Sequence, residues 1–343
     1  MPHGTFLRFI LPSLAAMLIF IAAPVVSVLV QSLHIEHAQV LVQVENCNPF
    51  SGCVKTTTVD AAATARLRSE SPLGRFNGVG TYLDRNHLAT AEVAQAWTSS
   101  ASLGDFGSRL MVLPFYRAMA FTLTYTFVVT PVVIVLGMLV ALGVNSLPAI
   151  VKGPTIFASL LPMIVTPLIG SLILFWMIDA RGIIGSSLQT LTGDPDLSLK
   201  ASPALTWLTL MIYGVWHSAP FAFIVFYAGL QTVSSDTLEA AMIDGASRWA
   251  RIRYVVIPHM APLVMFVVLI QLMDNFRVFE PIVGFSAAAN ATSLSYNIYG
   301  DLAQANPSFG SAAATSMLTV IGIAILLLPV LVRTWRDFNQ RRT

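Results

Sequence analysis

Residues 118–151 read AMAFTLTYTFVVTPVVIVLGMLVALGVNSLPAIV and contain no Asp, Glu, Lys or Arg. A helix that crosses the hydrocarbon core of a bilayer needs roughly 20 consecutive, mainly apolar residues. This stretch is long enough and apolar enough to meet that requirement. It therefore predicts a transmembrane helix.

Several other stretches of the 343-residue chain also lack charged residues over 20 positions or more. They are 9–35, 153–178, 201–235, 254–273 and 302–332. Only 10% of all residues are charged, whereas a soluble protein carries about a quarter. We therefore expect an all-α membrane protein with six transmembrane helices. Another uncharged stretch, 281–300, is rich in Gly, Ser and Asn, and we interpret it as a loop.

The first apolar stretch has an alternative interpretation as a cleaved signal peptide, whose apolar core is shorter. Its 27 uncharged residues favour a retained transmembrane helix within residues 1–32. Residues 33–114 are then an extramembrane loop or small domain. Residues 115–343 form a core of five transmembrane helices.

The basic residues outside the apolar stretches predict the orientation of the chain. If the N-terminus is cytoplasmic, the inner segments carry nine Lys and Arg residues and the short outer loops carry two. Cytoplasmic loops are enriched in Lys and Arg, and loops longer than about 60 residues do not follow this rule. We therefore predict that both termini are cytoplasmic and that residues 33–114 lie outside.

The two cysteines of the chain, Cys47 and Cys53, both lie in this outer segment. In an oxidising compartment they are candidates for a disulfide that closes the loop ENCNPFSGC. Two unpaired thiols are the alternative. No Cys and His residues have the spacing of a metal site, so we expect no metal.

The chain lacks a nucleotide-binding motif. The Lys of a phosphate-binding loop follows a Gly. The three lysines are instead preceded by Val54, Val151 and Leu199. Gly-x-Ser-x-Gly and His-Glu-x-x-His motifs are missing as well. We therefore expect no enzyme, and any ATP hydrolysis on which the chain depends must occur on another chain.

The longest inner loop, between the fourth and fifth apolar stretches, reads SSDTLEAAMIDGASRWARIRYVVIPHMAPL. It predicts two short helices separated by a bend at Gly245, which tolerates conformations that other residues avoid. Ser235 or Asp236 is expected to cap the first helix, and Asp244 the second.

The second helix of this loop carries apolar residues at helical spacing. Pro258 should end it, and Pro262 should open the next span. A bent, charged helix pair suits docking in a groove of a partner protein. An amphipathic helix that lies on lipid headgroups is the alternative.

Three short runs in this loop resemble the EAA motif of bacterial ABC-importer permeases. They are Glu239-Ala240-Ala241, Asp244-Gly245-Ala246 and Ile257-Pro258. The resemblance implies a type I ABC importer permease fold, with residues 232–260 as the cytoplasmic coupling loop. In that family the loop docks in a cleft of the ATPase subunit. Closure of the ATPase dimer then switches the membrane cavity from inward-facing to outward-facing.

Other phrases of the chain resemble the sugar-permease branch of that family. They are FILPSLAAMLIFIAAPVVSVLVQSL, FNGVGTYL, FASLLPMIVTPLIGSLILFWMI and SYNIYGDLAQANPSFGSAAATSMLTVI. The chain departs from the branch in its extended first periplasmic loop and at Phe276-Arg277, where the branch has Phe-Asp.

The resemblance also implies a location and a set of partners. The location is the bacterial inner membrane. The partners are a second homologous permease subunit, two ATPase subunits that bind ATP and Mg, a periplasmic solute-binding protein and membrane lipid, without nucleic acid. No cofactor is expected on this chain itself.

Polar and aromatic residues within the spans are candidates for the substrate path, because polar groups in a membrane usually face the bundle interior. These candidates are Trp216, Gln271, Asp274, Asn275, Arg277, Phe279, Ser311 and Thr315. An Asp274–Arg277 ion pair and plain packing of the aromatic rings are the alternatives. In the third span, Pro162 and Pro167 predict kinks.

The resemblance implies an importer of a sugar or glycoside, and the guanidinium of Arg277 would suit an anionic one. A polyamine or a glycerol-phosphate derivative is the alternative within the same transporter class. A secondary transporter would show internal repeats and a central relay of ionisable residues. A membrane-embedded enzyme would need a catalytic constellation within the spans. The sequence shows neither.

Overall fold

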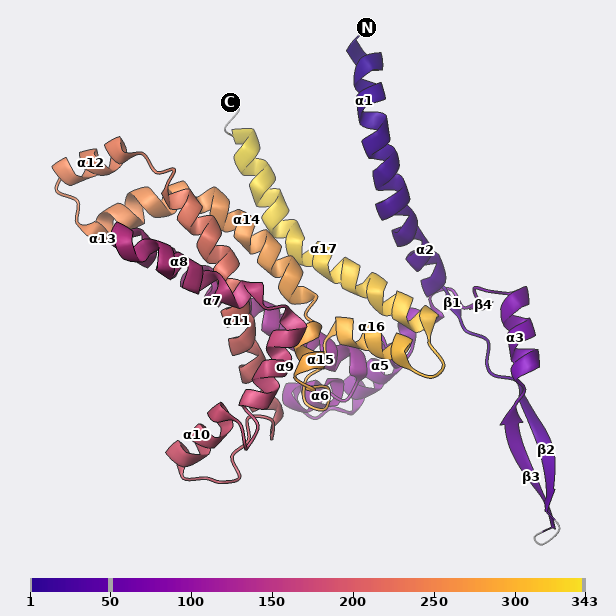
Figure 1. The fold of residues 1–343 in the computed structure, drawn as a ribbon. Coiled ribbons are helices and arrows are strands. Elements are labelled where there is room, and N and C mark those ends of the chain that lie inside the picture. The colour runs from indigo at the N-terminus through magenta and orange to yellow at the C-terminus, as the bar shows by residue number, and fades with distance from the viewer. Residues whose placement is uncertain (1, 49–51, 341–343) are drawn as a thin grey trace. The chain divides into compact units, whose positions relative to one another are not determined.

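A computed structural model of the chain describes residues 2–48 and 52–340. The chain is mainly helical (Figure 1), and it divides into two compact units. The first unit comprises Met1–Tyr116 and Asn297–Val320, and the second comprises Arg117–Tyr296 and Ile321–Thr343. Three helices contribute residues to both units: α7 (Pro114–Asn145), α16 (Leu294–Ala303) and α17 (Phe309–Gln340).

The first unit begins with a long helical segment that carries the first predicted span. It comprises α1 (Pro2–Met17), the π-helical turn η1 (Leu18–Ala22) and α2 (Ala23–Ser32). Pro24 lies at the start of α2 and has no N–H to donate. Ala23, directly before it, donates its N–H to the carbonyl of Leu18, five residues back. This wider turn lets the helix continue through the proline.

Short helices and two small antiparallel sheets make up the predicted outer segment, residues 33–114, of the first unit. These elements are β1 (His34–Ile35), β2 (Leu41–Asn48), β3 (Gly52–Val59), α3 (Ala61–Glu70), β4 (Arg75–Phe76), α4 (Gly80–Leu83), α5 (Thr90–Ser99) and α6 (Leu103–Leu110). β1 pairs with β4, and β2 pairs with β3 in a separate hairpin (Figure 1).

The first turn of α17 packs against this outer segment. Gly310 donates its N–H to the carboxylate of Glu36 at 2.6 Å. A Cβ atom at Gly310 would collide with the carbonyl oxygen of His34. The glycine is therefore needed for the two backbones to approach each other.

The second unit is a bundle of helices. Besides its share of α7, α16 and α17, it contains α8 (Ala149–Ile164), α9 (Pro167–Met177), α10 (Ile183–Thr192), α11 (Pro203–Leu230), α12 (Ser235–Ile243), α13 (Arg248–Arg251), η2 (Ile252–Val256), α14 (Ile257–Phe276) and α15 (Glu280–Gly284). Helices α7, α11 and α14 supply most of its largest fully buried side chains, which are Phe121, Phe223, Phe226 and Phe276, and Phe285 follows directly after α15.

The prediction of six spans agrees with the helices of the structure. In the described part of the chain, Arg8–Ser32, Pro114–Asn145, Pro203–Leu230, Arg248–Phe276 and Phe309–Arg336 are long and apolar enough to cross a membrane. Helices α8 and α9 pass the same test as a pair that is bent by 92°. Counted as one broken span, the pair is the sixth.

The prediction of a plain loop at 281–300 is wrong in part. Helix α15 covers its first residues and α16 its last. Glu280 and Pro281 occupy the first turn of α15, where an acidic side chain and a proline both favour helix formation. Both helices are too short to cross a membrane, so the stretch adds no further span.

Gly137 allows α7 and α11 to pack closely, and we expect it to be needed for stability. A Cβ at this position would lie 2.6 Å from the Cβ of Ala222. Gly137→Ala should therefore destabilise the protein by about 1–3 kcal/mol through overpacking. The check is the midpoint of thermal unfolding of the purified chain in detergent.

Gly143→Ala is the matched control on the same helix, because no atom lies within 4 Å of the added Cβ. It should leave stability unchanged or raise it by up to about 1 kcal/mol through helix propensity. Equal midpoints for the two variants would contradict the close approach.

Candidate functional site

The predicted coupling loop forms two helices, α12 and α13, joined by a tight turn (Figure 1). The N–H of Gly245 donates to the carbonyl of Met242, and the N–H of Ala246 donates to the carbonyl of Ala241. These two bonds define a Schellman motif, in which the residue after the helix end is left-handed. Gly245 has a φ of +76°, so the predicted bend at this residue is confirmed.

This turn gives a physical reason for the spacing of the motif residues. Ala241 and Ala246 hold the two positions that commonly make an apolar contact across a Schellman turn. Both residues are partly buried, whereas Glu239, Ala240 and Asp244 are exposed. The alanines and the glycine therefore build the turn, and the exposed residues are available to a partner.

The capping predictions for this loop are wrong. Helix α12 begins at Ser235, so Ser235 and Asp236 lie inside it, and the residue before them, Ser234, makes no side-chain capping bond. Helix α13 is capped by Ser247, whose hydroxyl accepts the N–H of the helix's third residue at 3.2 Å. Asp244 cannot cap α13, because it ends α12 and the turn separates it from α13.

The prediction that Pro258 ends a helix is also wrong. Helices α13, η2 and α14 form one helical segment, Arg248–Phe276. The N–H of Ile257 donates to the carbonyl of Ile252, five residues back, so a π-helical turn ends directly before the proline. The turn accommodates the missing N–H of Pro258 without breaking the helix. Pro262 lies inside α14 and does not open it.

Large apolar side chains on the coupling loop are exposed. Ile243 is 87% exposed, Trp249 67% and Tyr254 72%. The guanidinium of Arg253 lies 5.7 Å from the ring centre of Tyr254. Exposed apolar side chains rimmed by charges are typical of a surface that binds a protein or a membrane. The geometry alone is therefore consistent with both interpretations of this loop, docking in a partner protein and binding to lipid headgroups.

The predicted substrate-path residues of the fifth span fall into two groups. Gln271 and Asn275 are buried, at 3% and 4% exposure. The side-chain nitrogen Nδ2 of Asn275 donates to the hydroxyl of Thr130 on α7 at 3.0 Å and to the side-chain oxygen Oε1 of Gln271 at 3.3 Å. These amides therefore connect α14 to α7, a packing role that the sequence analysis did not anticipate.

Asp274 and Arg277 form the other group. Their side chains make an ion pair at 2.6 Å, and each is about half exposed. The ion pair considered as an alternative from the sequence is thus present. Of the two candidate aromatic residues, Trp216 is 48% exposed and Phe279 is partly buried.

The kink predicted at Pro167 corresponds to a complete break between α8 and α9, whereas Pro162 lies inside α8. Imidazole Nε2 of His217 lies 3.1 Å from the carbonyl oxygen of Val165, and the hydroxyl of Tyr213 donates to the carbonyl of Pro167 at 2.8 Å. Because a carbonyl only accepts, Nε2 of His217 carries the proton. The two side chains satisfy carbonyls at the break, which lipid could not do.

Sequence reasoning missed Tyr213 and His217 as partners of this break. A signal was present, because they are polar residues four positions apart within an apolar stretch. That spacing places both side chains on one face of α11. Which carbonyls they would reach depends on the packing of α11 against the broken span, and the sequence does not specify it.

Ser311 and Thr315 lie in the first unit. The hydroxyl of Ser311 donates to the carboxylate of Asp301 at 2.6 Å, and its carbonyl oxygen lies 3.1 Å from Nε2 of His87. Ser311 also lines a polar cavity of about 560 Å³, together with Glu36, Asp301 and His87. Thr315 is only 3% exposed and does not line this cavity.

The cysteines lie in the β2–β3 hairpin. Cys53 is disulfide-bonded. Cys47 lies opposite it in the register of the two strands. The side chain of Cys47 is outside the described part of the structure, so the pairing of the two stays a prediction.

A charged cluster follows the end of α9. The backbone N–H of Arg181 donates to the carboxylate of Asp179 at 3.3 Å, and the ammonium of Lys200 lies 3.3 Å from the other carboxylate oxygen. The backbone donor, and then the ammonium, lower the pKa of Asp179. Lys200 also lies 3.6 Å from the ring centre of Phe175. The cluster therefore ties the segment before α11 to α9.

Comparison with protein families identifies the chain. Residues 106–343 match the family described as the binding-protein-dependent transport system inner membrane component. The chain belongs to this family. The matched range contains every helix from α7 to α17, and with them the coupling loop and the broken third span.

Relatives of this permease are transport subunits. It is 30% identical to the trehalose transport system permease protein SugA of Mycobacterium tuberculosis over 243 residues, 70% of this chain and 76% of that protein. It is 31% identical to the sn-glycerol-3-phosphate transport system permease protein UgpA of Rhizobium meliloti over 210 residues, 57% of this chain and 71% of that one. Such proteins are translocation components and not enzymes.

A solved structure shares the fold of the permease. It is the crystal structure of a bacterial ABC transporter involved in the import of the acidic polysaccharide alginate. The TM-score is 0.58 at 20% identity, and the match covers 75% of this chain and 92% of that chain. The family match and this shared fold together confirm the expected ABC-importer permease with a type I fold.

Gly245 should be the residue on which the turn between α12 and α13 depends. A Cβ at this position would meet no atom within 4 Å, so its φ of +76° is the only obstacle to substitution. Gly245→Ala should destabilise the turn by about 1–2 kcal/mol, because alanine disfavours the left-handed conformation. Hydrogen exchange of the amides of Gly245→Ala and wild-type permease around this turn provides the measurement.

Gly245→Asn is the matched variant, because asparagine adopts the left-handed conformation more readily. Its amides should exchange at rates between those of wild type and Gly245→Ala. If Gly245→Ala exchanges as slowly as wild type, the Schellman turn does not limit the opening of this loop.

Proposed function

We propose that the permease imports a sugar or glycoside, in a complex that hydrolyses ATP on separate subunits. The names of its relatives support the sugar class, since one of them transports trehalose. Because another relative is an sn-glycerol-3-phosphate permease, a glycerol-phosphate derivative is the second candidate substrate. The substrate itself is supplied by a solute-binding protein, as the family description indicates.

The coupling loop is the single observation that carries the ATP-driven part of this proposal. Its exposed Glu239 and Asp244 lie beside exposed Ile243 on a compact helix pair. Such a mixed surface suits a protein groove, and membership of this transporter family favours that interpretation over headgroup binding. We propose that the groove belongs to an ATPase subunit, that two such subunits bind ATP and Mg, and that a second homologous permease completes the pore.

The continuity of α13, η2 and α14 provides a route from ATP hydrolysis to the membrane. Movement of the docked loop is carried into the fifth span without an intervening hinge, because the helical segment is unbroken from Arg248 to Phe276. Closure of the ATPase dimer would thus move α14 directly. That movement would change the access of the substrate path.

The distribution of charge supports the orientation. Nine Lys and Arg residues would lie on the cytoplasmic side and three, Arg181, Lys200 and Arg277, in the short outer loops if both termini are cytoplasmic. Residues 33–114 are then periplasmic, where Cys53 would form its disulfide with Cys47 in an oxidising compartment. The loop 232–260 lies on the same side as the ATPase.

A neutral substrate is favoured over an anionic one. Arg277 is the basic group suggested for binding an anion, and it is already paired with Asp274 at 2.6 Å. The pair has no net charge. We propose that both groups bond hydroxyls of the substrate and that the rings of Trp216 and Phe279 stack on a sugar face, while Gln271 and Asn275 hold α14 in place. Ser311 and Thr315 remain candidates within the first unit.

Glu239→Lys should weaken coupling strongly without preventing membrane insertion. Reversal of one charge in a docked interface should reduce ATP-driven uptake by roughly tenfold or more, equivalent to about 1.4 kcal/mol or more. Uptake is measured in vesicles that contain the permease, its ATPase and its binding protein. Glu70→Lys, the same reversal at an exposed site on α3, is the control and should keep wild-type uptake. Wild-type uptake by Glu239→Lys would refute the docking role.

The substrate class is tested on the cognate binding protein. A bound ligand raises the thermal midpoint, by an amount equivalent to about 2.7 kcal/mol at a hundredfold excess over Kd. Neutral disaccharides, such as trehalose, should raise the midpoint most. A response to sn-glycerol-3-phosphate or a polyamine alone would replace the sugar assignment, and it would leave the ATP-driven permease assignment intact.

A further inference from the structure

Helices α5 and α6, which precede the second span, present an uncovered apolar surface. Trp97 is 62% exposed, Leu103 79%, Met111 47% and Val112 70%. Soluble surfaces contain single exposed apolar residues, but a contiguous group marks an interaction site. These four residues lie within sixteen positions of one another and belong to two short helices and the link that follows them.

The sequence of α6 separates apolar from polar residues on two opposite sides. Leu103, Phe106 and Leu110 recur at a spacing of three and four residues and therefore share one side of the helix. Trp97 of α5 joins this side, because its ring packs edge-to-face on Phe106 with the ring centres 5.2 Å apart. Ser108 lies on the opposite side of the helix.

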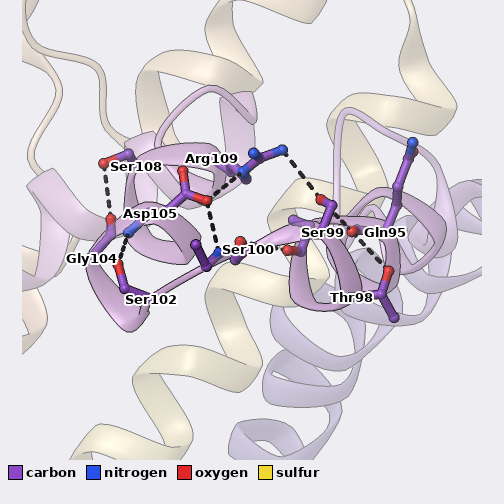
Figure 2. A network of polar contacts seen from close by, with 11 residues as sticks. Gln95, Thr98, Ser99, Ser100, Ser102, Gly104, Asp105, Ser108 and Arg109 are labelled. Carbon is purple, nitrogen blue, oxygen red and sulfur yellow. Dashed lines mark hydrogen bonds and ion pairs between the residues drawn. The ribbon is translucent and has the colours of Figure 1, made fainter.

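The polar side of α6 is already bonded (Figure 2). The carboxylate of Asp105 accepts the backbone N–H of Ala101 and the Nε–H of Arg109, both at 3.2 Å. Nη1 of Arg109 donates to the hydroxyl of Ser99 on α5 at 3.2 Å, and Ser102 caps α6 by accepting the N–H of Asp105. The two helices are thus joined through their polar side, and the apolar side is left free.

The position of α6 in the chain indicates what covers the apolar side. The helix ends at Leu110, and the transmembrane helix α7 begins at Pro114. The intervening residues can span at most roughly 14 Å. Exposed Met111 and Val112 lie in this link, so the apolar surface runs up to the start of a membrane span.

We propose that the apolar side of α5 and α6 is embedded in the headgroup–acyl boundary of the bilayer leaflet where α7 begins. A helix with one apolar and one polar side lies in this plane, with its apolar side inserted by roughly 5–10 Å. Tryptophan is enriched at the same depth. The bilayer is the favoured occupant, because this surface continues into an apolar helix that the bilayer already surrounds. The element anchors the outer segment at the membrane surface.

Fluorescence quenching in vesicles tests this proposal. Two variants, Leu103→Cys and Val112→Cys, each carry an environment-sensitive fluorophore on the apolar surface of the permease. The unlabelled parent protein provides the background signal. Ser108→Cys is the matched control on the polar side of the same helix. The protein is reconstituted in equal parts of phosphatidylcholine and phosphatidylglycerol, with bromine in the middle of the phosphatidylcholine acyl chains.

Labels at 103 and 112 should lose fluorescence to the brominated lipid, show blue-shifted emission and be protected from aqueous iodide. The label at 108 should be quenched by aqueous iodide, should not be quenched by the brominated lipid and should show no blue shift of its emission. Quenching by iodide alone at 103 and 112 would place the surface in water and overturn the proposal. Protection from both quenchers would also overturn it, and would assign the surface to a protein partner. Each apolar position is an independent test if the other variant fails to fold.

Discussion

A peptide group inside a bilayer has no water with which to form hydrogen bonds, and the architecture of this permease depends on that constraint. Long uncharged stretches must be helical there, because a helix satisfies its own backbone. Each proline in such a stretch removes a donor. Before Pro24 and Pro258 the chain forms a π-helical turn, and the helix continues. In the third span it breaks instead, and side chains of α11 bond the carbonyls at the break.

These two responses to proline have different consequences for a transporter. A π-helical turn keeps the helix continuous, so α13, η2 and α14 form one helical segment, Arg248–Phe276. A break provides a bend, here of 92° between α8 and α9. Discontinuous helices are common beside the substrate sites of transporters. The second unit therefore combines a continuous helix through Pro258 with a broken span whose carbonyls are bonded by Tyr213 and His217.

The polar residues at the end of the fifth span are close together in the sequence but differ in how deeply they are buried. Asn275 and Gln271 are one helical turn apart and both are buried; the side chain of Asn275 bonds Thr130 on α7 and Gln271 on its own helix. Asp274 and Arg277 belong to the same helix end but remain half exposed and paired. A buried amide costs little when it is hydrogen-bonded, whereas a buried unpaired charge costs much more. The amides therefore occupy the interior, and the charges remain where they can meet each other and solvent.

The sequence by itself determined the six apolar spans, the bend at Gly245 and membership of the permease family. These features depend on composition and local conformation: hydrophobic length, a left-handed glycine and a motif with fixed spacing. Only the tertiary structure decided the roles of Asn275, Gln271, Tyr213 and His217, because each depends on which carbonyl or hydroxyl a neighbouring helix presents. It also decided that the helix continues through Pro258. The turn before Pro258 widens to accommodate the missing N–H, and the local sequence does not specify that widening.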